Sequence, residues 1–246
     1  MSAAARSGRA EKSGRPAGAT RRARSSRGRS DALRVVVTAG PTREYVDPVR
    51  YLSNESSGRM GFALAARAAE RGFDVTLVAG PVALPDPPGV RRVDVVSARD
   101  MLQAVREAFR GADALIMAAA VADWRPARRL PGKWRKKDDG SDRASIELVR
   151  NPDILATVAR DKGARTVVGF ALETSDGVRR ALRKLERKGL DWICLNDASA
   201  LNAARSSVTI LGKDGSTQRL VDQPKESVAD ALLDLLPTRR ETAGGA

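Results

Sequence analysis

The stretch LRVVVTAGP at residues 33–41 decides the fold. Its consecutive valines and its glycine–proline end are typical of a short strand that is buried on both faces of a sheet. A polar loop follows, and then apolar residues recur at helical spacing to about Arg71, where Gly72 supplies a stop. We expect Ser56 or Ser57 to cap this helix, because serine is a favoured N-cap residue.

The alternation of apolar strand and amphipathic helix continues almost to the C-terminus. This order predicts an α/β fold, Rossmann-like, with a mainly parallel sheet and helices on both faces. A Gly-Lys-Asp-Gly turn signal at 212–215 predicts a C-terminal β-hairpin extension. The expected strands span 35–40, 75–78, 93–96, 114–121, 166–171, 191–195, 208–211 and 218–221, and the later helices begin after Ser97 and at Pro152 and span 176–188 and about 225–236.

Composition excludes several kinds of chemistry. The chain of 246 residues has no histidine and one cysteine, which removes Ser-His-Asp hydrolysis, histidine proton shuttling and a structural zinc site. Cys194 lies in an apolar run and reads as a buried thiol in a reducing compartment. With no apolar run near 18 residues and no signal peptide, we expect no membrane segment and a cytoplasmic location.

Positive charge is concentrated at the N-terminus. The net charge is +14, and residues 1–30 contribute +8 of it through eight Arg, one Lys and one Glu. We therefore expect a disordered basic tail at 1–32, one folded domain at 33–237 and a second disordered tail at 238–246. The basic tail is either a solvated extension or a weak, salt-sensitive contact for nucleic acid or a membrane surface, and nucleic acid is otherwise not an expected partner.

Ligands of open α/β sheets bind beyond the carboxyl ends of the strands. At the first such end, Ser56, Ser57 and Gly58 open a helix whose free amides are suited to an anion. No G-x-G-x-x-G fingerprint and no Walker lysine follow the strand, so this is not a typical dinucleotide site. The alternative is an ordinary capped helix after a loop.

The second strand end combines small residues with charge. The strand at 114–121 ends in alanines that allow a ligand to approach the backbone, and Asp123 is suited to a ribose hydroxyl or a metal-bound phosphate. A polar segment follows at about 124–144, with seven cations between 125 and 137. It is either a solvated face or a flexible flap that closes over a polyphosphate.

The third strand end adds a possible helix start and two lysines. Pro152 suits the first position of a helix, and Phe170 is suited either to stacking on a base or to the core. Lys184 and Lys188 lie four residues apart on one helix face, as ordinary surface lysines also do. From these residues alone, the chain is an α/β protein for an anionic, nucleotide-like ligand.

Five segments together resemble the signature of bacterial phosphopantothenoylcysteine synthetases, in matching order across roughly residues 34–235. They are DPVRYLSNESSGRMG at 47–61, AAAVAD at 118–123, Lys133-x-Arg135-Lys136, NPDI at 151–154 and GFALET at 169–174.

The resemblance implies a ligase of coenzyme A biosynthesis. Such an enzyme joins 4′-phosphopantothenate to L-cysteine with CTP through an acyl-cytidylate, giving 4′-phosphopantothenoylcysteine, CMP and pyrophosphate. The eukaryotic branch, which favours ATP, differs around the first motif, so CTP is the expected nucleotide. Mg²⁺ would arrive with the triphosphate rather than in a site made by protein alone, and the family forms homodimers with the substrate site near the interface.

The resemblance also assigns roles to residues. Asn54 resembles the side chain that holds the acyl-cytidylate, Arg50 its neighbour in the substrate pocket, and Lys133 the flap lysine, and these are the expected catalytic residues. The expected nucleotide contacts are Met117, Ala118, Ala119, Asp123, Lys133, Pro152, Asp153, Ile154, Leu155, Phe170, Lys184 and Lys188, and the expected phosphate or substrate contacts are Ser56, Ser57, Gly58 and Ala120.

Three features depart from the family pattern. The segment from Leu201 to Ser207 differs after the Asn196-Asp197 strand end, at the edge of the expected nucleotide pocket. Only the basic tail precedes Leu33, so we expect a stand-alone synthetase without the flavin-dependent decarboxylase domain, with a separate decarboxylase as a possible partner. Arg135 replaces the middle lysine of the flap, which keeps the charge but changes its geometry. Two other functions compete with this one: an NAD(P)-dependent Rossmann reductase and a non-catalytic nucleotide-binding homologue.

Overall fold

The computed structural model describes residues 32–135, 142–173, 176–197 and 205–237. Both predicted tails, apart from Ala32, and the middle of the predicted flap lie outside these ranges.

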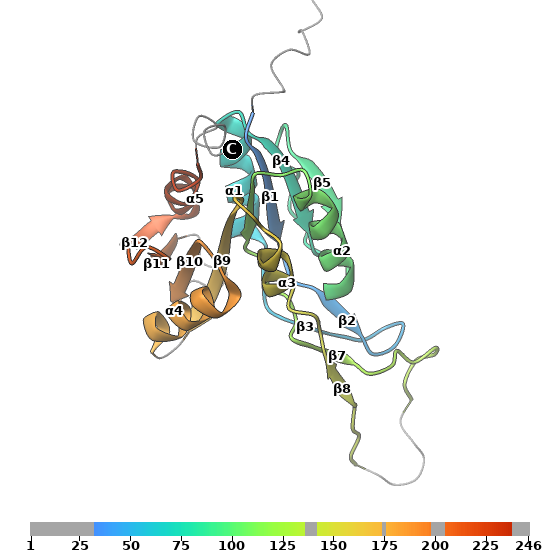
Figure 1. Cartoon of the computed structure of the whole chain (residues 1–246). Helices are drawn as coiled ribbons and strands as arrows, with labels where there is room; N and C mark the ends of the chain where they lie inside the picture. The colour runs from blue at the N-terminus through green and yellow to red at the C-terminus, as the bar shows by residue number, and fades with distance from the viewer. Residues whose placement is uncertain (1–31, 136–141, 174–175, 198–204, 238–246) are drawn as a thin grey trace, which may run out of the picture. The chain divides into compact units, whose positions relative to one another are not determined.

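One sheet of eight strands organises the described residues, in the order β12-β11-β10-β9-β6-β1-β4-β5 (Figure 1). The six strands from β10 to β5 run parallel to one another. β11 pairs antiparallel with β10, and β12 pairs antiparallel with β11. The predicted α/β, Rossmann-like sheet with a C-terminal hairpin is therefore confirmed. The strands are β1 (Arg34–Ala39), β4 (Asp74–Ala79), β5 (Arg91–Asp94), β6 (Ala114–Met117), β9 (Thr166–Glu173), β10 (Trp192–Asp197), β11 (Arg205–Gly212) and β12 (Thr217–Pro224).

Helices cover both faces of this sheet, as predicted. The helices α1 (Arg59–Glu70) and α5 (Lys225–Leu233) pack on one face, and α2 (Ala98–Phe109), α3 (Ile154–Arg160) and α4 (Gly177–Lys188) pack on the other. The valines of β1 explain why the strand is continuously apolar. Val35 and Val37 face the α1 side and Val36 faces the α2 side, and all three are at most 1% exposed. Each such burial contributes about 1.5–3 kcal/mol.

Two helix ends follow the rules that the sequence indicates. Ser97 caps α2 in a capping box, because its hydroxyl accepts from the Asp100 amide at 3.2 Å and the Asp100 carboxylate accepts from the Ser97 amide at 2.9 Å. Gly189 ends α4 in the left-handed conformation. Two strand predictions need correction: the strand expected at 93–96 lies at 91–94, and the one expected at 114–121 ends at Met117.

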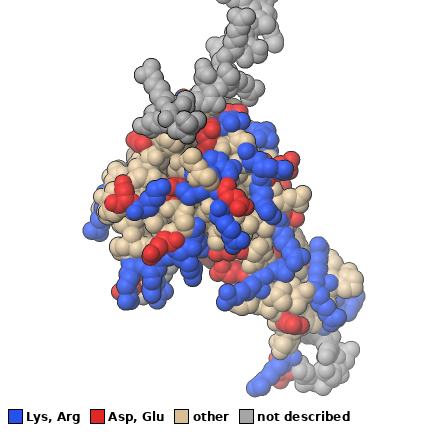
Figure 2. All heavy atoms as spheres, in the orientation of Figure 1, with Lys and Arg blue, Asp and Glu red and all other residues tan. Residues whose placement is uncertain are grey.

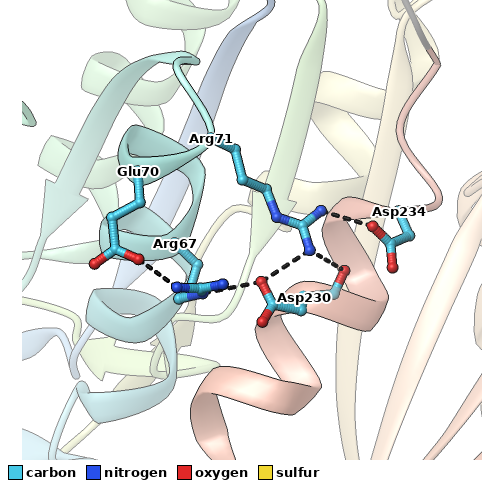
Figure 3. A network of polar contacts seen from close by, with 5 residues as sticks. All are labelled: Arg67, Glu70, Arg71, Asp230 and Asp234. Carbon is cyan, nitrogen blue, oxygen red and sulfur yellow. Dashed lines mark hydrogen bonds and ion pairs between the residues drawn. The ribbon is translucent and has the colours of Figure 1, made fainter.

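Ion pairs fasten α1 to α5 on their shared face. Figure 3 shows Arg67 of α1 and Arg71, the C-cap of that helix, reaching Asp230 of α5. The distances are 2.9 and 2.8 Å, and Arg71 also reaches Asp234 at 2.7 Å. The Arg67 guanidinium, followed by that of Arg71, holds the pKa of Asp230 below its usual value. The C-terminal helix is thereby fixed against the helix that begins at the predicted anion site.

Two antiparallel ribbons extend from the carboxyl edge of the sheet (Figure 1). One pairs β2 (Arg43–Tyr45) with β3 (Tyr51–Ser53), and the other pairs β7 (Trp124–Pro126) with β8 (Leu148–Arg150). We call these two ribbons the arm. The base of the predicted flap is therefore a β-ribbon rather than an open loop.

Candidate active site

The chain segments that leave β1 and β6 are joined beyond the carboxyl ends of both strands. The Ala120 amide donates to the Gly40 carbonyl at 2.9 Å. Two buried threonine hydroxyls accept further amides, Thr38 from Ala119 at 3.1 Å and Thr42 from Ala122 at 3.0 Å. These bonds explain why β6 ends at Met117. The amides of Ala119 and Ala122 donate to threonine side chains instead of to a neighbouring strand. They fix Ala118, Ala119 and Ala120, with Met117 before them, at the strand edge.

Asn54 lies beside these alanines. Its side-chain amide donates to the main-chain carbonyls of Val121 at 3.1 Å and Ala120 at 3.4 Å, across 66 or more residues of sequence. The side chain is exposed. These two bonds hold the Asn54 side chain next to the small residues that follow β6.

The start of α1 differs from the prediction. Neither Ser56 nor Ser57 caps the helix: the N-cap is Gly58, at φ 75°, with no side-chain cap bond. A Cβ on Gly58 would lie 3.1 Å from Val82 Cγ1 and 3.4 Å from the Gly40 nitrogen, so glycine is needed for this close approach. With no side-chain cap and no acidic residue in the first turn, the opening amides of α1 remain suited to an anion.

Asp47 connects the loop between β2 and β3, residues 46–50, to the segment that carries Lys133. It is fully buried, and one carboxylate oxygen accepts the amides of Val49 and Arg50 at 2.7 Å each. The other accepts the Trp134 amide at 3.0 Å and the Arg50 guanidinium at 3.2 Å. The Trp134 amide, ahead of those of Val49 and Arg50, lowers the pKa of Asp47.

Arg50 and Lys133 are therefore brought near each other. Arg50 also donates to the Trp134 carbonyl at 2.9 Å, and Trp134 is the residue after Lys133. Both Arg50 and Lys133 are exposed. Of the remaining flap cations, Lys136 and Lys137 lie outside the described residues.

The third predicted segment joins the same edge through Asn151. Its amide side chain donates to the Ala122 carbonyl at 2.8 Å, and its main-chain amide donates to the Asp123 carbonyl at 2.8 Å. Asp123 itself is exposed. The expectation that Pro152 opens the helix is wrong: Asp153 is the N-cap of α3, and its carboxylate accepts the Ala156 amide at 3.0 Å.

Lysines of α4 reach this segment and the end of β9. Lys188 pairs with Asp153 at 2.7 Å, and Lys184 donates to the Phe170 carbonyl at 2.7 Å. Burial raises the pKa of Asp153, but the Lys188 ammonium and the Ala156 amide outweigh that effect and hold the pKa below its usual value. Figure 2 shows many more cationic side chains over α4 and along the arm. Asp153 and the two lysines thus meet on the α3 and α4 side, where Ile154 and Leu155 are buried.

Phe170 lies on the other face of the sheet from Lys184 and Lys188. Its half-buried ring packs against the core beneath α1 and α5, on the opposite face from α4. The predicted site therefore flanks the strand ends, with the opening of α1 and the Phe170 ring on one side and the two lysines on the other.

Sequence reasoning missed three groups that position the site: Thr42, Glu44 and Asn151 as a bridging side chain. Glu44, 3% exposed, accepts the Ala98 amide at 2.8 Å and so joins the arm to the start of α2. Glu44 stands between Arg43 and Tyr45, and nothing in this local sequence indicates that its side chain is buried. Asp47-Pro48, by contrast, is a turn signal, and it could have identified the Asp47 turn.

Other chemistry in the described residues is limited. They contain no group of three or more His, Cys, Asp or Glu suited to a metal ion. Cys194 is fully buried, and burial raises the pKa of its thiol, so it is not an accessible nucleophile. A hollow of about 540 Å³ lies at the opposite edge of the sheet, beside Arg34, Asp74 and Arg91, and contains none of the predicted residues. In the same described part of the chain, the helices lack the length and apolar character that crossing a bilayer requires.

A parallel sheet whose carboxyl edge carries the start of an uncapped helix, small residues and lysines is an α/β fold with an edge suited to a phosphate-bearing ligand. The family model described as "DNA/pantothenate metabolism flavoprotein C-terminal domain" matches residues 31–238. The chain belongs to this family.

Curated relatives and a solved structure agree with this assignment. The coenzyme A biosynthesis bifunctional protein CoaBC of Escherichia coli K12 is 47% identical over 212 residues, 84% of this chain, and that of Mycobacterium bovis is 42% identical over 219 residues, 83% of this chain. The chain spans about half, 52%, of the length of each of these relatives. The crystal structure of the C-terminal domain of CoaBC is 38% identical, with a TM-score of 0.73, and the match covers 85% of this chain and 96% of that one.

Proposed function

We propose that this chain is a phosphopantothenate–cysteine ligase, which joins 4′-phosphopantothenate to L-cysteine with CTP in the cytoplasm. The observation that carries the proposal is the connected set of hydrogen bonds at the carboxyl edge. These bonds join Asn54 to Ala120, Asn151 to Asp123, and Lys188 to Asp153. Membership of the family and the match to the C-terminal domain of CoaBC support it.

The reaction has two balanced steps. The carboxylate of 4′-phosphopantothenate attacks the α-phosphorus of CTP, and the bond to the β-phosphate breaks to release pyrophosphate. The amine of cysteine then attacks the acyl carbon of the acyl-cytidylate, loses a proton, and expels CMP. Negative charge develops on phosphate and carbonyl oxygens in both steps, so fixed donors are the effective catalysts.

Arg50 and Lys133 are proposed as those donors, and Asn54 as the side chain that holds the acyl-cytidylate beside them. Asn54 is held against Ala120 and Val121, so its amide is preorganised beside the strand end. Arg50 and the Lys133 segment share the buried Asp47, which fixes the arm loop relative to the lysine. Preorganised donors cost little reorganisation during reaction, which is why their positions matter more than their number.

The nucleotide is proposed to lie across the strand ends, with its phosphates toward Lys184 and Lys188. The opening amides of α1 would hold a second anionic group, and Ala118 and Ala119 would allow the cytidine close to the backbone. Mg²⁺ would come with the triphosphate, bound mainly by phosphate oxygens and water. Asp123, exposed directly before β7, offers one further carboxylate.

We also propose that the arm pairs two copies of this chain. Five large apolar side chains on it or beside it are between 39% and 60% exposed: Val49, Tyr51, Trp124, Ile146 and Leu148. Apolar surface of this kind, close to Asn54 and Arg50, suits a homodimer interface near the substrate site. Whether the decarboxylase is fused or separate, the product of this ligase carries the cysteine carboxylate that a decarboxylase would remove.

Pyrophosphate release tests the proposed function. The purified chain is mixed with 4′-phosphopantothenate, L-cysteine and Mg²⁺, together with CTP or ATP. We expect release with CTP, little with ATP, and 4′-phosphopantothenoylcysteine by mass spectrometry. No release with either nucleotide would reject the ligase and favour a non-catalytic homologue. A reductase is disfavoured by the family match and by the missing glycine fingerprint, and binding of NADPH would revive it.

A further inference from the structure

Lys225 is a buried cation that pairs with no carboxylate of the described residues. It is the first residue of α5 and 8% exposed, and its ammonium donates to the Ser206 hydroxyl at 3.0 Å. Within the described ranges, no other hydrogen bond and no ion pair of this ammonium is found. An ammonium has three protons to donate, and a buried lysine is ordinarily paired with a negative group.

This cation lies at the carboxyl edge of the sheet. Val208 of β11 pairs with Asn196 near the carboxyl end of β10, and Ser206 lies two residues beyond that point. The helix α5 that begins at Lys225 packs along α1, on the same side as the Phe170 ring. Lys225 is therefore on the opposite side of the strand ends from Lys184 and Lys188.

A second cation, Arg59, acts electrostatically on Lys225. Burial lowers the pKa of Lys225 most and the Arg59 guanidinium lowers it further, while the Glu226 carboxylate raises it without offsetting the two. Arg59 is the first residue of α1 and is exposed, and among the described residues it has no ion pair or hydrogen bond through its side chain. Two neighbouring cations repel each other, and a bound anion would relieve that repulsion.

The helix geometry adds to the positive potential here. α1 has 12 residues, no side-chain cap and no acidic residue in its first turn. The free amides at its start and the positive end of its dipole lie next to Arg59. The buried ammonium of Lys225 is an observation independent of the helix end, and both favour the same kind of ligand.

We propose that Lys225, Ser206 and Arg59 form an anion subsite on the α1 and α5 side of the strand ends, which holds a phosphate group of a substrate. Its ligand identity rests on the proposed ligase function. That reaction brings together two phosphorylated molecules, the nucleotide and 4′-phosphopantothenate, and two cationic groups on opposite sides of the strand ends match two separate phosphates. The shared chemistry is a phosphate dianion, and binding measurements distinguish the two sources.

Calorimetric titration of the full chain tests the subsite. One titration uses pyrophosphate with Mg²⁺. The other uses 4′-phosphopantothenate, with pantothenate as the unphosphorylated reference. Lys225→Met keeps an unbranched side chain of similar length and removes the charge. Lys213→Met is the matched control, because Lys213 lies in the turn at the opposite end of the β11–β12 hairpin.

We expect Lys225→Met to weaken binding of one of the two ligands by about tenfold or more, and Lys213→Met to leave the affinity for both unchanged. The ligand whose affinity falls is the one whose phosphate occupies the subsite. Arg59→Gln changes an exposed residue and does not threaten folding, and it should weaken binding of the same ligand by a few-fold. If both variants bind both ligands with unchanged affinity, the subsite is overturned even if the ligase reaction proceeds. Lost affinity in a chain that makes no product would keep the subsite and reject the ligase.

Discussion

The buried carboxylate of Asp47 accepts the main-chain amide of Trp134 at 3.0 Å, from a residue 87 positions further along the chain. Arg50 shares the same carboxylate. One side chain thus sets the distance between the loop that leads to Asn54 and the segment that carries Lys133, so it should act as a positioning residue for the proposed reaction.

We predict that Asp47→Asn lowers kcat by about 10- to 100-fold with a smaller change in KM. The new amide group places a donor against the Trp134 amide and the Arg50 guanidinium, which are themselves donors. Steady-state pyrophosphate release checks the split between kcat and KM.

The pH dependence of stability provides a second readout for Asp47→Asn. The lowered pKa means that Asp47 stabilises the fold fully above its unfolded pKa of about 3.9 and loses this contribution as pH falls through the lower folded value. The difference in urea midpoint between wild type and variant should be constant from pH 7 to about 5 and shrink below 4. A constant difference down to pH 3 would contradict the assignment.

Asn54→Asp should lower product formation by at least about 100-fold while the chain stays folded. The carboxylate would face the Ala120 and Val121 carbonyls, which accept from Asn54 in the present structure, and would repel a bound phosphate. Mass spectrometry of product measures the loss, and circular dichroism checks the fold. Asn54→Ala separates the two effects: it should retain more activity than the aspartate, because it adds no charge. Wild-type turnover in the aspartate variant would remove Asn54 from the site.

Lys133→Gln should impair turnover far more than folding. Lys133 is exposed, so the free energy of unfolding should change by no more than about 0.5 kcal/mol. Loss of a cation from the developing charge should lower kcat by about 100-fold. Arg128→Gln is the control, because Arg128 is an exposed cation in the same segment. Equal losses in the two variants would mean that the segment contributes only general positive charge.

Lys188→Met should raise KM for CTP by about tenfold and leave kcat nearly unchanged. Lys188 is paired with Asp153 at 2.7 Å, and in the proposed complex it binds the triphosphate in the ground state and the transition state alike. Initial rates at varied CTP give both constants. Arg187→Met, an exposed neighbour on α4, should change neither. A large fall in kcat alone would assign Lys188 to the chemical step instead.

The order of strands and helices was predictable because it depends on local pattern. The valines of β1 and the capping box at Ser97 each express their structure within a few residues. The errors fall where distant segments decide. Ser56 and Ser57 have the right chemistry for a cap, but the close approach of α1 to Gly40 requires glycine at position 58.

The candidate site shows the same limit. The motifs indicated which residues belong together, but no spacing shows that Asn54 donates to Val121 or that Asp47 accepts from Trp134, because these partners are far apart in sequence. Pro152 suited a helix start, yet Asp153 supplies a side-chain cap that proline lacks. Lys225 gave no signal at all, since burial of a lysine at the first position of a helix follows from tertiary packing.

Gly61→Ala should destabilise the chain by about 1–2 kcal/mol, against the usual gain of about 0.5–1 kcal/mol for this change inside a helix. A Cβ at this position would lie 2.5 Å from the Ala39 Cβ and 2.7 Å from the Thr38 carbonyl oxygen, so α1 must move away from β1. Urea unfolding measures the loss. Gly111→Ala is the control, because its Cβ would meet only the Arg34 guanidinium at 3.6 Å, and its stability should be unchanged or slightly higher. Since α1 opens the predicted anion site beside Gly40, the same variant should also raise KM for the phosphorylated substrates. A destabilised chain with unchanged KM would show that the start of α1 does not contribute to binding.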